Sequence, residues 1–288
     1  MFIFKEHGRL GNQIFQYSAL RTLCKQNEKL ILLGFEDLQA TFDNVDAKLV
    51  NSNSTRADFF LYRQAYIALN LLAKNRIVNS VSESKPGIKK GILYTPGMLK
   101  SINFVEESYF QWEYSFSPSA ISSLSLKLSL EQFAKKLISE VSGSSPCFFV
   151  HIRRGDYTHW PSSEHPAVLP LKYYRYCINL VRDSIPDAFM IFVSDDPFYV
   201  EDFFGDMKNA YISRHSSLKD FALITQCCGG ILSASSFSWW GAYLSHRKNF
   251  RRCFLAPEHW LRHRAHSWDP PAIKSSFLTY VEADSYRV

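Results

Sequence analysis

The residues best suited to chemistry in this sequence follow a short apolar run, Cys147-Phe148-Phe149-Val150. Turn-forming residues precede the run, which therefore predicts a buried strand. The strand leads directly into an imidazole, two guanidinium groups and a carboxylate, at His151, Arg153, Arg154 and Asp156. Guanidinium groups pair with phosphate oxygens through two hydrogen bonds at once, which indicates a phosphate or pyrophosphate ligand. A surface ion-pair cluster, with Asp156 neutralising one arginine, is the alternative that these residues leave open.

Two more polar clusters follow predicted strands, Ser194-Asp195-Asp196 and Ser235-Ser236-Phe237-Ser238. The expected strands of this half are 188–193, 210–213, 230–233 and 253–256, alternating with helices at 173–183, 198–204, 218–227 and 239–245. Such alternation predicts a parallel sheet with right-handed crossovers. Because parallel strands end at one edge, the three clusters are expected to meet there, where open α/β sheets bind ligands.

Each of these clusters also has a plainer interpretation. Ser235 and Ser236 precede a predicted helix, where they could bind phosphate or simply cap the helix. Asp195 and Asp196 could bind Mg²⁺ or ribose hydroxyls, or could form a turn before Pro197. Adjacent carboxylates point apart on an extended chain, so chelation of one cation by both is disfavoured. We therefore expect no metal site here.

The first half of the chain carries fewer chemical signals. Its expected strands are 1–5 and 29–33 and its expected helices 11–25, 57–73 and 120–141, with residues 75–96 irregular. The loop Gly8–Gln13 joins a strand to a helix, an arrangement that presents backbone N–H groups to a ligand. The loop lacks the GxGxxG spacing of dinucleotide sites. The aromatic segment Tyr109–Phe116 fits either a sugar site or a buried strand.

Length and composition narrow the class of protein. A chain of 288 residues, 46% of them hydrophobic, is expected to form two domains. We place them at 1–143 and 144–288, because a long helical pattern ends at Gly143. No run approaches the roughly 18 apolar residues of a membrane span, and charged residues follow Met1–Phe4 at once, unlike a signal peptide. The six cysteines form no CxxC pair, which favours reduced, buried thiols, and we expect a cytoplasmic protein.

The net charge is +6, with basic residues gathered at His246–Arg252 and Arg262–Arg264. Nucleic acid binding would explain this density, but a solvated basic face is a commoner explanation. Peripheral contact with an anionic membrane surface is a third. We expect no nucleic acid partner, and loose association with the inner face of the membrane through these two basic segments.

Together the polar clusters resemble the three motifs of the α-1,2-fucosyltransferases, glycosyltransferase family 11. The matching segments are His151–Tyr157, Ser194–Asp196 and Ser235–Leu244. Gly8–Tyr17 resembles the amino-terminal signature of that family, and Glu107–Phe116 resembles a diverged copy of its central aromatic segment. The resemblance extends from about residue 8 to about residue 260, with the motifs in the right order.

The resemblance implies an α/β, GT-B-like architecture of two Rossmann-like lobes. The carboxyl-terminal lobe would hold the donor GDP-fucose and the amino-terminal lobe would face the acceptor. It implies inverting, metal-independent transfer of L-fucose to the 2-hydroxyl of a galactose residue in a glycan, with no cofactor beyond the donor, and a role in bacterial surface polysaccharide synthesis. Two other functions stay open: a metal-dependent sugar-nucleotide transferase using Asp195 and Asp196, and a non-catalytic protein that binds carbohydrate or nucleotide.

Carried over residue by residue, the resemblance assigns Arg153 to the β-phosphate, with Arg154 supporting it. It assigns Ser235 and Ser236 to the pyrophosphate. The remaining candidate donor-binding residues are His151, Asp195 and Asp196, for ribose or guanine, together with Asn12, Gln13, Ser194, Asp220, Phe237 and Ser238.

The general base for the acceptor hydroxyl is left open among Asp156, Glu113 and Glu164, and Asp156 could instead orient an arginine. Ala234 and Gly229 depart from the family, which often has Asn before the serine pair and a polar residue upstream. These departures leave the pyrophosphate contacts intact and put the guanine contacts and the choice of acceptor in doubt.

Overall fold

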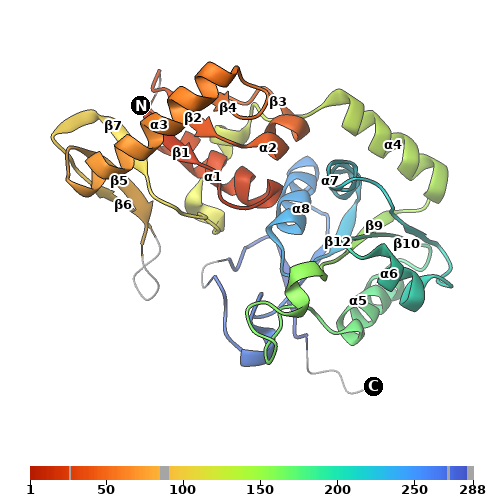
Figure 1. Ribbon diagram of the computed structural model, residues 1–288. Helices are drawn as coiled ribbons and strands as arrows, with labels where there is room; N and C mark the ends of the chain where they lie inside the picture. The colour runs from red at the N-terminus through yellow and green to blue at the C-terminus, as the bar shows by residue number, and fades with distance from the viewer. Residues whose placement is uncertain (26, 85–90, 271–272, 284–288) are drawn as a thin grey trace. The chain divides into compact units, whose positions relative to one another are not determined.

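The computed structural model describes residues 1–25, 27–84, 91–270 and 273–283, which form two compact units, Met1–Lys127 and Leu128–Val288 (Figure 1). The division lies one helix before the boundary predicted at Gly143. The helix concerned, α4 (Leu128–Ser142), packs on α7 (Ser217–Gln226) in unit 2. There Nζ of Lys219 lies 4.6 Å from the ring centroid of Phe133, and the ring of His215 meets the same side chain edge-on. The apolar side of α4 therefore belongs to the second unit.

Unit 2 contains a six-stranded parallel sheet in the order β11-β10-β9-β12-β13-β14. The strands are β9 (Cys147–Ile152), β10 (Phe189–Ser194), β11 (Ala210–Ile212), β12 (Gly229–Ile231), β13 (Phe254–Pro257) and β14 (Thr279–Val281). The connecting helices are α5 (Leu171–Ser184), α6 (Pro197–Phe204), α7 and α8 (Ser236–Lys248). This is the strand order of a Rossmann sheet, and it confirms the predicted alternation, with β14 as an unpredicted addition.

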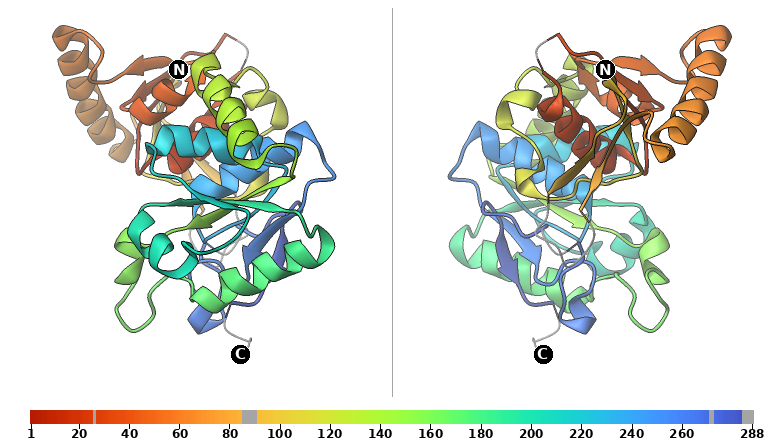
Figure 2. Two further views of the ribbon diagram at one scale, coloured as in Figure 1. Left: turned by 90° about the vertical axis from the view of Figure 1, so that its right-hand side faces the viewer. Right: turned by 90° about the vertical axis from the view of Figure 1, so that its left-hand side faces the viewer.

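Strand β9 is buried along its whole length because helices cover both faces of this sheet. Phe148, Val150 and Ile152 share one core cluster with side chains of α5 and α6. Helices α7 and α8 lie on the opposite face and pack against each other, as the views in Figures 1 and 2 show. The residues after β9 are thereby held at a fixed edge of a rigid layer.

Unit 1 contains a second six-stranded sheet, in the order β4-β2-β1-β7-β5-β6, parallel except for the β5–β6 pair. Its strands are β1 (Phe2–Lys5), β2 (Leu30–Leu33), β4 (Lys48–Val50), β5 (Val78–Glu83), β6 (Ile92–Thr95) and β7 (Leu99–Val105), and its helices are α1 (Leu10–Leu23), α2 (Glu36–Thr41) and α3 (Arg56–Lys74). Short strands β3 (Phe42–Asp43) and β8 (Ser125–Leu126) pair separately. Helix α3 covers one face, where Ile3, Ile31 and Phe104 form the core with it.

Two predictions for unit 1 are wrong, and one open alternative is decided. Residues 75–96, expected to be irregular, contain β5 and β6, because the polar residues of β5 are satisfied inside the sheet: Nδ2 of Asn79 donates to Oδ1 of Asn103 at 2.8 Å. The helix expected over 120–141 begins only at Leu128, after a 3₁₀ turn that ends at Ile121 and the strand β8. Segment 109–116, for which a sugar site or a buried strand stayed open, is not a strand: it contains a 3₁₀ turn at Glu113–Ser115, and Phe110 has a φ of +55°.

All six cysteines are free thiols, as predicted, and Cys147, Cys177 and Cys227 are buried while Cys253 is exposed. Among the residues that the structure describes, no helix combines the length and the hydropathy needed to cross a membrane.

Candidate functional site

The three polar clusters of unit 2 meet at the carboxyl edge of its sheet. Ile152 at the end of β9 is in register with Ser194 at the end of β10, and Val150 with Ile231 at the end of β12. The chain order of the strands reverses between β9 and β12, and such a switch point is where open α/β sheets bind ligands. The predicted meeting of the clusters is confirmed.

Arg153 lies between two carboxylates at this edge. Its Nη1 is 2.8 Å from Oδ2 of Asp195, and its Nη2 pairs with Oδ1 of Asp156. The side chain of Arg153 is largely buried, whereas that of Asp156 is 63% exposed. Asp195 therefore fixes the guanidinium against the sheet edge, and Asp156 covers it from the solvent side.

Arg154 is held by a different set of contacts. Its Nε lies 3.1 Å from Oδ2 of Asp196, and its guanidinium carbon lies 3.4 Å from the ring centroid of Tyr199. Asp196 also caps α6, because its Oδ1 accepts a hydrogen bond from the backbone N of Tyr199 at 3.1 Å. Asp196 thus caps the helix that begins at Pro197, where the sequence indicated a turn, and it orients an arginine at the same time.

Gly155 allows Asp195 to approach the backbone. The backbone N of Arg154 donates to Oδ1 of Asp195 at 2.8 Å. A Cβ at position 155 would lie 2.6 Å from Oδ2 of the same carboxylate, closer than non-bonded atoms come. The glycine in the motif is therefore explained by the carboxylate that packs on it.

His151 lies beneath this edge and is buried. Its Nδ1 is 2.7 Å from Oγ of Ser233, and its ring stacks on Phe237 with centroids 5.4 Å apart. Burial, with a smaller contribution from the nearby Arg153 cation, lowers the pKa of His151 to about 3. The imidazole is therefore neutral near pH 7 and links β9 to the loop after β12.

The serines after β12 divide into two kinds. Ser235 is the N-cap of α8, its Oγ accepting from the backbone N of Phe237 at 3.3 Å, and Ser236 opens the helix and is half-buried. Ser238 is fully buried and donates to the carbonyls of Ser233 and Ser235 at 3.2 and 3.1 Å. Only the first two are placed to present a hydroxyl or a backbone N–H to an anion at the helix N-terminus.

Ser194 and Asp220 support neighbouring loops. Oγ of Ser194 donates to the carbonyl of Ile152 at 2.7 Å, tying the ends of β10 and β9 together. Asp220 lies buried in the first turn of α7 and accepts a hydrogen bond from Oγ of Ser213, which follows β11. Burial raises the pKa of Asp220 to about 6. A buried carboxylate is costly to the fold, which is a common property of functional groups.

Four residues of this site were not singled out from the sequence: Tyr157, Tyr199, Tyr173 and Ser233. Tyr157 Oη donates to the carbonyl of Ala234 at 2.9 Å, and Tyr173 Oη donates to that of Leu232 at 3.0 Å. Both bonds fix the loop after β12 from the side of β9 and α5. Tyr157 is the last residue of the segment His151–Tyr157 and directly follows Arg-Arg-Gly-Asp, so the sequence could have indicated its place in the site.

The departure at Gly229 has a steric reason. A Cβ at this position would lie 2.4 Å from Cε1 of Phe148 and 2.6 Å from the carbonyl oxygen of Cys253. Position 229 lies inside β12, so a larger polar side chain does not fit here without moving the neighbouring strands. Ala234 is buried in the loop that Tyr157 holds.

Asn12 and Gln13 belong to unit 1, where they make internal contacts. Gln13 is buried; its Nε2 donates to Oε2 of Glu6 and its Oε1 accepts from the backbone N of Leu38. Asn12 Oδ1 accepts from Nε2 of Gln111 at 2.7 Å. The structure gives Gln13 a role in holding the loop after β1 to α2.

In unit 1, the segments Gly8–Tyr17 and Glu107–Phe116 contact each other at the carboxyl edge of the sheet. Nε2 of the buried Gln16 donates to the carbonyls of His7, after β1, and Ser108, after β7. This clamp brings Nε2 of His7 to 3.0 Å from Oε1 of Glu107, and the His7 ring meets that of Tyr109 edge-on at 4.8 Å. An imidazole, a carboxylate and an aromatic ring thus lie together, partly exposed, at the β1–β7 switch point.

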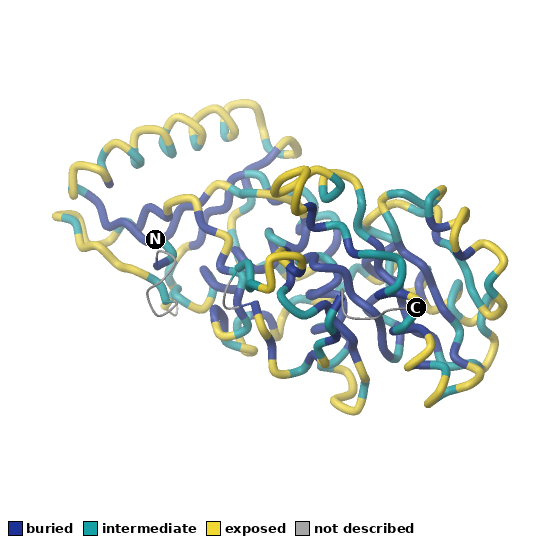
Figure 3. Tube along the Cα trace, turned by 90° about the horizontal axis from the view of Figure 1, so that it is seen from below, coloured by how far each residue is buried: buried dark blue, intermediate teal, exposed yellow. Residues whose placement is uncertain are grey.

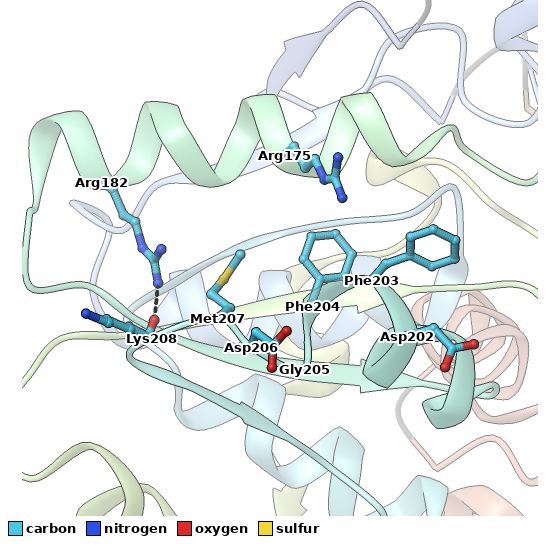
Figure 4. Close-up of a pocket in the computed structure, with 9 residues that line it drawn as sticks. All are labelled: Arg175, Arg182, Asp202, Phe203, Phe204, Gly205, Asp206, Met207 and Lys208. Atoms are coloured by element: carbon cyan, nitrogen blue, oxygen red, sulfur yellow. Dashed lines mark hydrogen bonds between the residues drawn. The ribbon is translucent and has the colours of Figure 1, made fainter.

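Figure 4 shows a shallow cavity of about 440 Å³ in unit 2 that we do not assign to the donor. Asp206, Met207 and Lys208 in its wall immediately precede β11, and Arg182 lies near the end of α5, before β10. These positions border the amino ends of the strands. The cavity therefore opens at the edge opposite the polar clusters.

Two cations of the basic segment His246–Arg252 are hydrogen-bonded to backbone carbonyls of the same unit. Nη1 of Arg252 donates to the carbonyls of Cys227 and Ser245 at 3.0 and 3.2 Å. Nζ of Lys248 donates to the carbonyl of Thr225 at 3.1 Å, and partial burial lowers the pKa of Lys248 to about 8. These two cations hold the end of α8 in place.

Comparison with known proteins identifies the family. Residues 95–268 match the family model described as Glycosyl transferase family 11. The chain belongs to glycosyl transferase family 11. The matched range covers the segment after β6, the Arg153 edge, the Asp195 cluster and the α8 N-terminus.

Two relatives of this family 11 chain are α-1,2-glycosyltransferases by name, and a third is an O-antigen biosynthesis glycosyltransferase. An α-1,2-colitosyltransferase of Escherichia coli is 27% identical over 91% of the chain and 93% of its own length. Galactoside α-(1,2)-fucosyltransferase 2 of Rattus norvegicus is 22% identical over 85% of the chain and 67% of its own length. The O-antigen biosynthesis glycosyltransferase WbnK of Escherichia coli is 32% identical over 44% of the chain, which spans less than half (42%) of that relative.

The fold also matches that of a protein solved in complex with GDP. POFUT1 in complex with GDP covers 88% of the family 11 chain at a TM-score of 0.51, with 10% sequence identity. At this identity the likeness concerns the fold alone. The two Rossmann-like units are the lobes of a GT-B architecture, as the resemblance implied.

Proposed function

We propose that this family 11 glycosyltransferase transfers L-fucose from GDP-β-L-fucose to the 2-hydroxyl of a galactose residue, with inversion. The proposal rests above all on one observation: two arginines, held by carboxylates from two loops, stand at the β9–β12 switch point beside the N-terminus of α8. The matching fold of a protein bound to GDP and the α-1,2 relatives support the donor and the linkage.

The arginines suit the chemistry of the leaving group. When the bond between fucose C1 and the phosphate oxygen breaks, its electrons stay on the GDP β-phosphate as negative charge. Donors that are already oriented toward this charge usually make the largest catalytic contribution. Arg153, the Ser235 and Ser236 hydroxyls and the α8 N-terminus supply such donors.

We propose that the Asp156 carboxylate leaves Arg153 when the donor binds. Three carboxylates and two guanidinium groups give the cluster one negative charge in excess, which would repel a pyrophosphate. Because Asp156 is the most exposed of the three, a phosphate can replace it on Nη2 of Arg153 while Asp195 still fixes Nη1. This favours the orienting role of Asp156 over a role as general base.

The acceptor is proposed to bind unit 1. In the transfer, the galactose O2 forms a bond to fucose C1 from the face opposite the leaving phosphate, and its proton passes to a base or to water. Tyr109, His7 and Glu107 offer the aromatic ring and the polar groups by which proteins bind sugars. The WbnK relative, an O-antigen biosynthesis glycosyltransferase, supports a glycan of a surface polysaccharide as acceptor. We propose in addition that the protein works in the cytoplasm.

No divalent cation is proposed for the reaction. Asp195 and Asp196, which the metal-dependent alternative would use, are each bonded to an arginine. A cation placed on either carboxylate would face a guanidinium at close range. The two arginines supply the positive charge that a metal provides in other transferases.

The decisive experiment measures transfer from GDP-fucose and from GDP-colitose to a panel of β-galactosides. The colitose arm is included because the colitosyltransferase matches most of the chain. We expect GDP-fucose to be used, with an α-1,2 product identified by its NMR couplings and linkage shifts. Transfer from GDP-colitose alone would replace the donor in the proposal. Tight GDP binding without transfer from either donor would favour the non-catalytic alternative.

A further inference from the structure

Helix α3 of unit 1 exposes a stripe of large apolar side chains, of which Phe59 and Ile67 also help to line a cavity of about 450 Å³ beside the sheet. Five large apolar side chains of this helix are at least 41% exposed: Phe59, Phe60, Leu61, Ile67 and Leu71. In Figure 3 the helix is exposed along most of its length, and in Figures 1 and 2 no described segment of unit 1 covers its outer side. Exposed apolar groups gathered in this way mark interaction surfaces rather than chance.

The stripe is separate from the face that holds α3 to the sheet. Tyr62, Tyr66, Leu69 and Leu72 pack on the core of unit 1. Successive helix residues are offset by about 100°, which places Phe60, Ile67 and Leu71 on nearly one line, opposite Leu69. Phe60 and Leu71 are 64% and 58% exposed. The helix is therefore apolar on two opposite faces, although its fold requires only one.

Cations run along one flank of the stripe. By the same helical geometry, Arg56, Arg63 and Lys74 lie within about 60° of the Phe60–Leu71 line, on one side of it. The one acidic residue of α3, Asp58, lies on the sheet-facing half. Glu6 and Glu36 line the same cavity as Arg63, but no acid of the helix itself lies beside the stripe. An apolar stripe flanked by cations of its own helix is the pattern of a helix that lies in the surface of an anionic bilayer.

We propose that α3 is a membrane-docking helix, whose Phe60–Ile67–Leu71 stripe enters the headgroup region of an anionic lipid bilayer while Arg56, Arg63 and Lys74 contact lipid phosphates. The charge pattern favours this occupant over an apolar protein surface, which would not need three cations beside the stripe. The inference differs from the expectation based on His246–Arg252, since two cations of that segment hold α8. It does not depend on the identity of the donor.

The test is vesicle flotation of the full-length protein. Vesicles contain either phosphatidylglycerol with phosphatidylcholine or phosphatidylcholine alone. We expect binding to the anionic vesicles and a loss of at least about tenfold in binding for the Phe60→Ser/Ile67→Ser variant, because two apolar side chains no longer enter the bilayer. The matched control is Phe198→Ser/Phe250→Ser, which removes two exposed rings of unit 2 and should leave binding unchanged.

A second pair of variants tests the charges. Arg56→Gln/Arg63→Gln/Lys74→Gln should lose about fivefold in binding to anionic vesicles for each cation. Arg247→Gln/Arg251→Gln/Arg264→Gln, on the basic segments of unit 2, should retain it. Circular dichroism and transfer to a short water-soluble acceptor, both unchanged, would show that the α3 variants are folded and active.

Three outcomes would overturn the inference. The first is equal vesicle binding by the wild type and both α3 variants, and the second is the absence of binding to any vesicle. The third is a dimer in sedimentation velocity that Phe60→Ser/Ile67→Ser dissociates, since a second copy would then cover the stripe. Loss of binding only in the unit 2 charge variant would assign membrane contact to His246–Arg252 and Arg262–Arg264 instead.

Discussion

Nη1 of Arg153 lies 2.8 Å from Oδ2 of Asp195, a carboxylate that follows a different strand. Asp195 also accepts a hydrogen bond from the backbone N of Arg154 at 2.8 Å. The carboxylate thus connects the end of β10 to the loop after β9 and fixes the guanidinium before any ligand arrives. Orientation achieved during folding needs no further reorganisation during the reaction.

Arg153→Lys should lower kcat by roughly 10²–10³-fold, because an ammonium cannot hold both Asp195 and a phosphate oxygen in fixed directions. Steady-state transfer from GDP-fucose measures the effect. The matched control is Arg182→Lys, an arginine of the same unit that donates to the carbonyl of Lys208 at the opposite sheet edge. A folded Arg153→Lys variant with nearly normal kcat would contradict the phosphate role.

Asp156→Asn should strengthen donor binding and leave kcat within a few-fold of the wild type. The substitution removes one carboxylate that competes with phosphate for Arg153, an exposed pair for which about 0.2–1 kcal/mol is typical. Calorimetric titration with GDP, together with kcat, separates the two candidate roles. A fall in kcat of about 10²-fold or more, with GDP affinity unchanged, would identify Asp156 as the general base.

Removal of divalent cations should leave transfer intact. If Arg153 and Arg154 carry the leaving-group charge, activity in excess EDTA equals activity without it, and added Mg²⁺ or Mn²⁺ changes it little. The measurement is the initial rate after dialysis against EDTA. Loss of most activity, restored by added metal, would reinstate Asp195 and Asp196 as metal ligands.

Asp220→Asn should stabilise the protein at pH 7. The pKa of Asp220 is raised from its ordinary 3.8 to about 6 by burial, so the folded protein binds this proton more tightly than the unfolded chain. The resulting stabilisation is present below about pH 4 and is lost as the pH rises through about 6. Asparagine resembles the protonated acid, so the variant should gain about 1–3 kcal/mol in free energy of unfolding at pH 7 and nothing near pH 4.

Urea unfolding at both pH values checks this expectation, with the exposed Asp183→Asn as control. We also expect weaker GDP binding by Asp220→Asn, since the resemblance places Asp220 in the donor site. The quantity to compare is the difference in free energy of unfolding between Asp220→Asn and the wild type. If this difference is the same at pH 7 and at pH 4, the buried carboxylate does not destabilise the fold.

Tyr173→Phe and Tyr174→Phe should differ in stability although the two residues are adjacent and both buried. Tyr173 Oη donates to the carbonyl of Leu232 at 3.0 Å, so its loss should cost about 1–2 kcal/mol. Tyr174 Oη is buried without a hydrogen-bond partner among the described residues, so its removal should cost nothing. Equal losses in urea unfolding would show that Tyr174 binds a buried water.

Much of unit 2 could be predicted from the sequence because its signals are local. Strand β9 is apolar apart from His151, as expected for a strand buried on both faces, and Ser235 caps α8 through a contact two residues away. Because the strands of the sheet are parallel, the polar residues that follow them lie at the same edge. The motif order then identified the family, which the match over residues 95–268 confirms.

Unit 1 was less predictable because its polar residues are satisfied far along the chain. Asn79 pairs with Asn103 inside the sheet, so β5 does not show an apolar pattern. Gln16 is fully buried and yet polar, because it bonds the carbonyl of Ser108 across the sheet edge. No pattern within a short window contains such partners.

The sequence by itself determined which residues carry charge and which strands carry them, since strand order and residue type are read along the chain. Only the tertiary structure decided what each charge does. Arg252 and Arg153 are both arginines in basic surroundings, but Arg252 holds two carbonyls of its own unit while Arg153 stands between carboxylates at an open edge. The difference arises because hydrogen-bond partners are set by distances in space, which the separation of residues along the chain does not reveal.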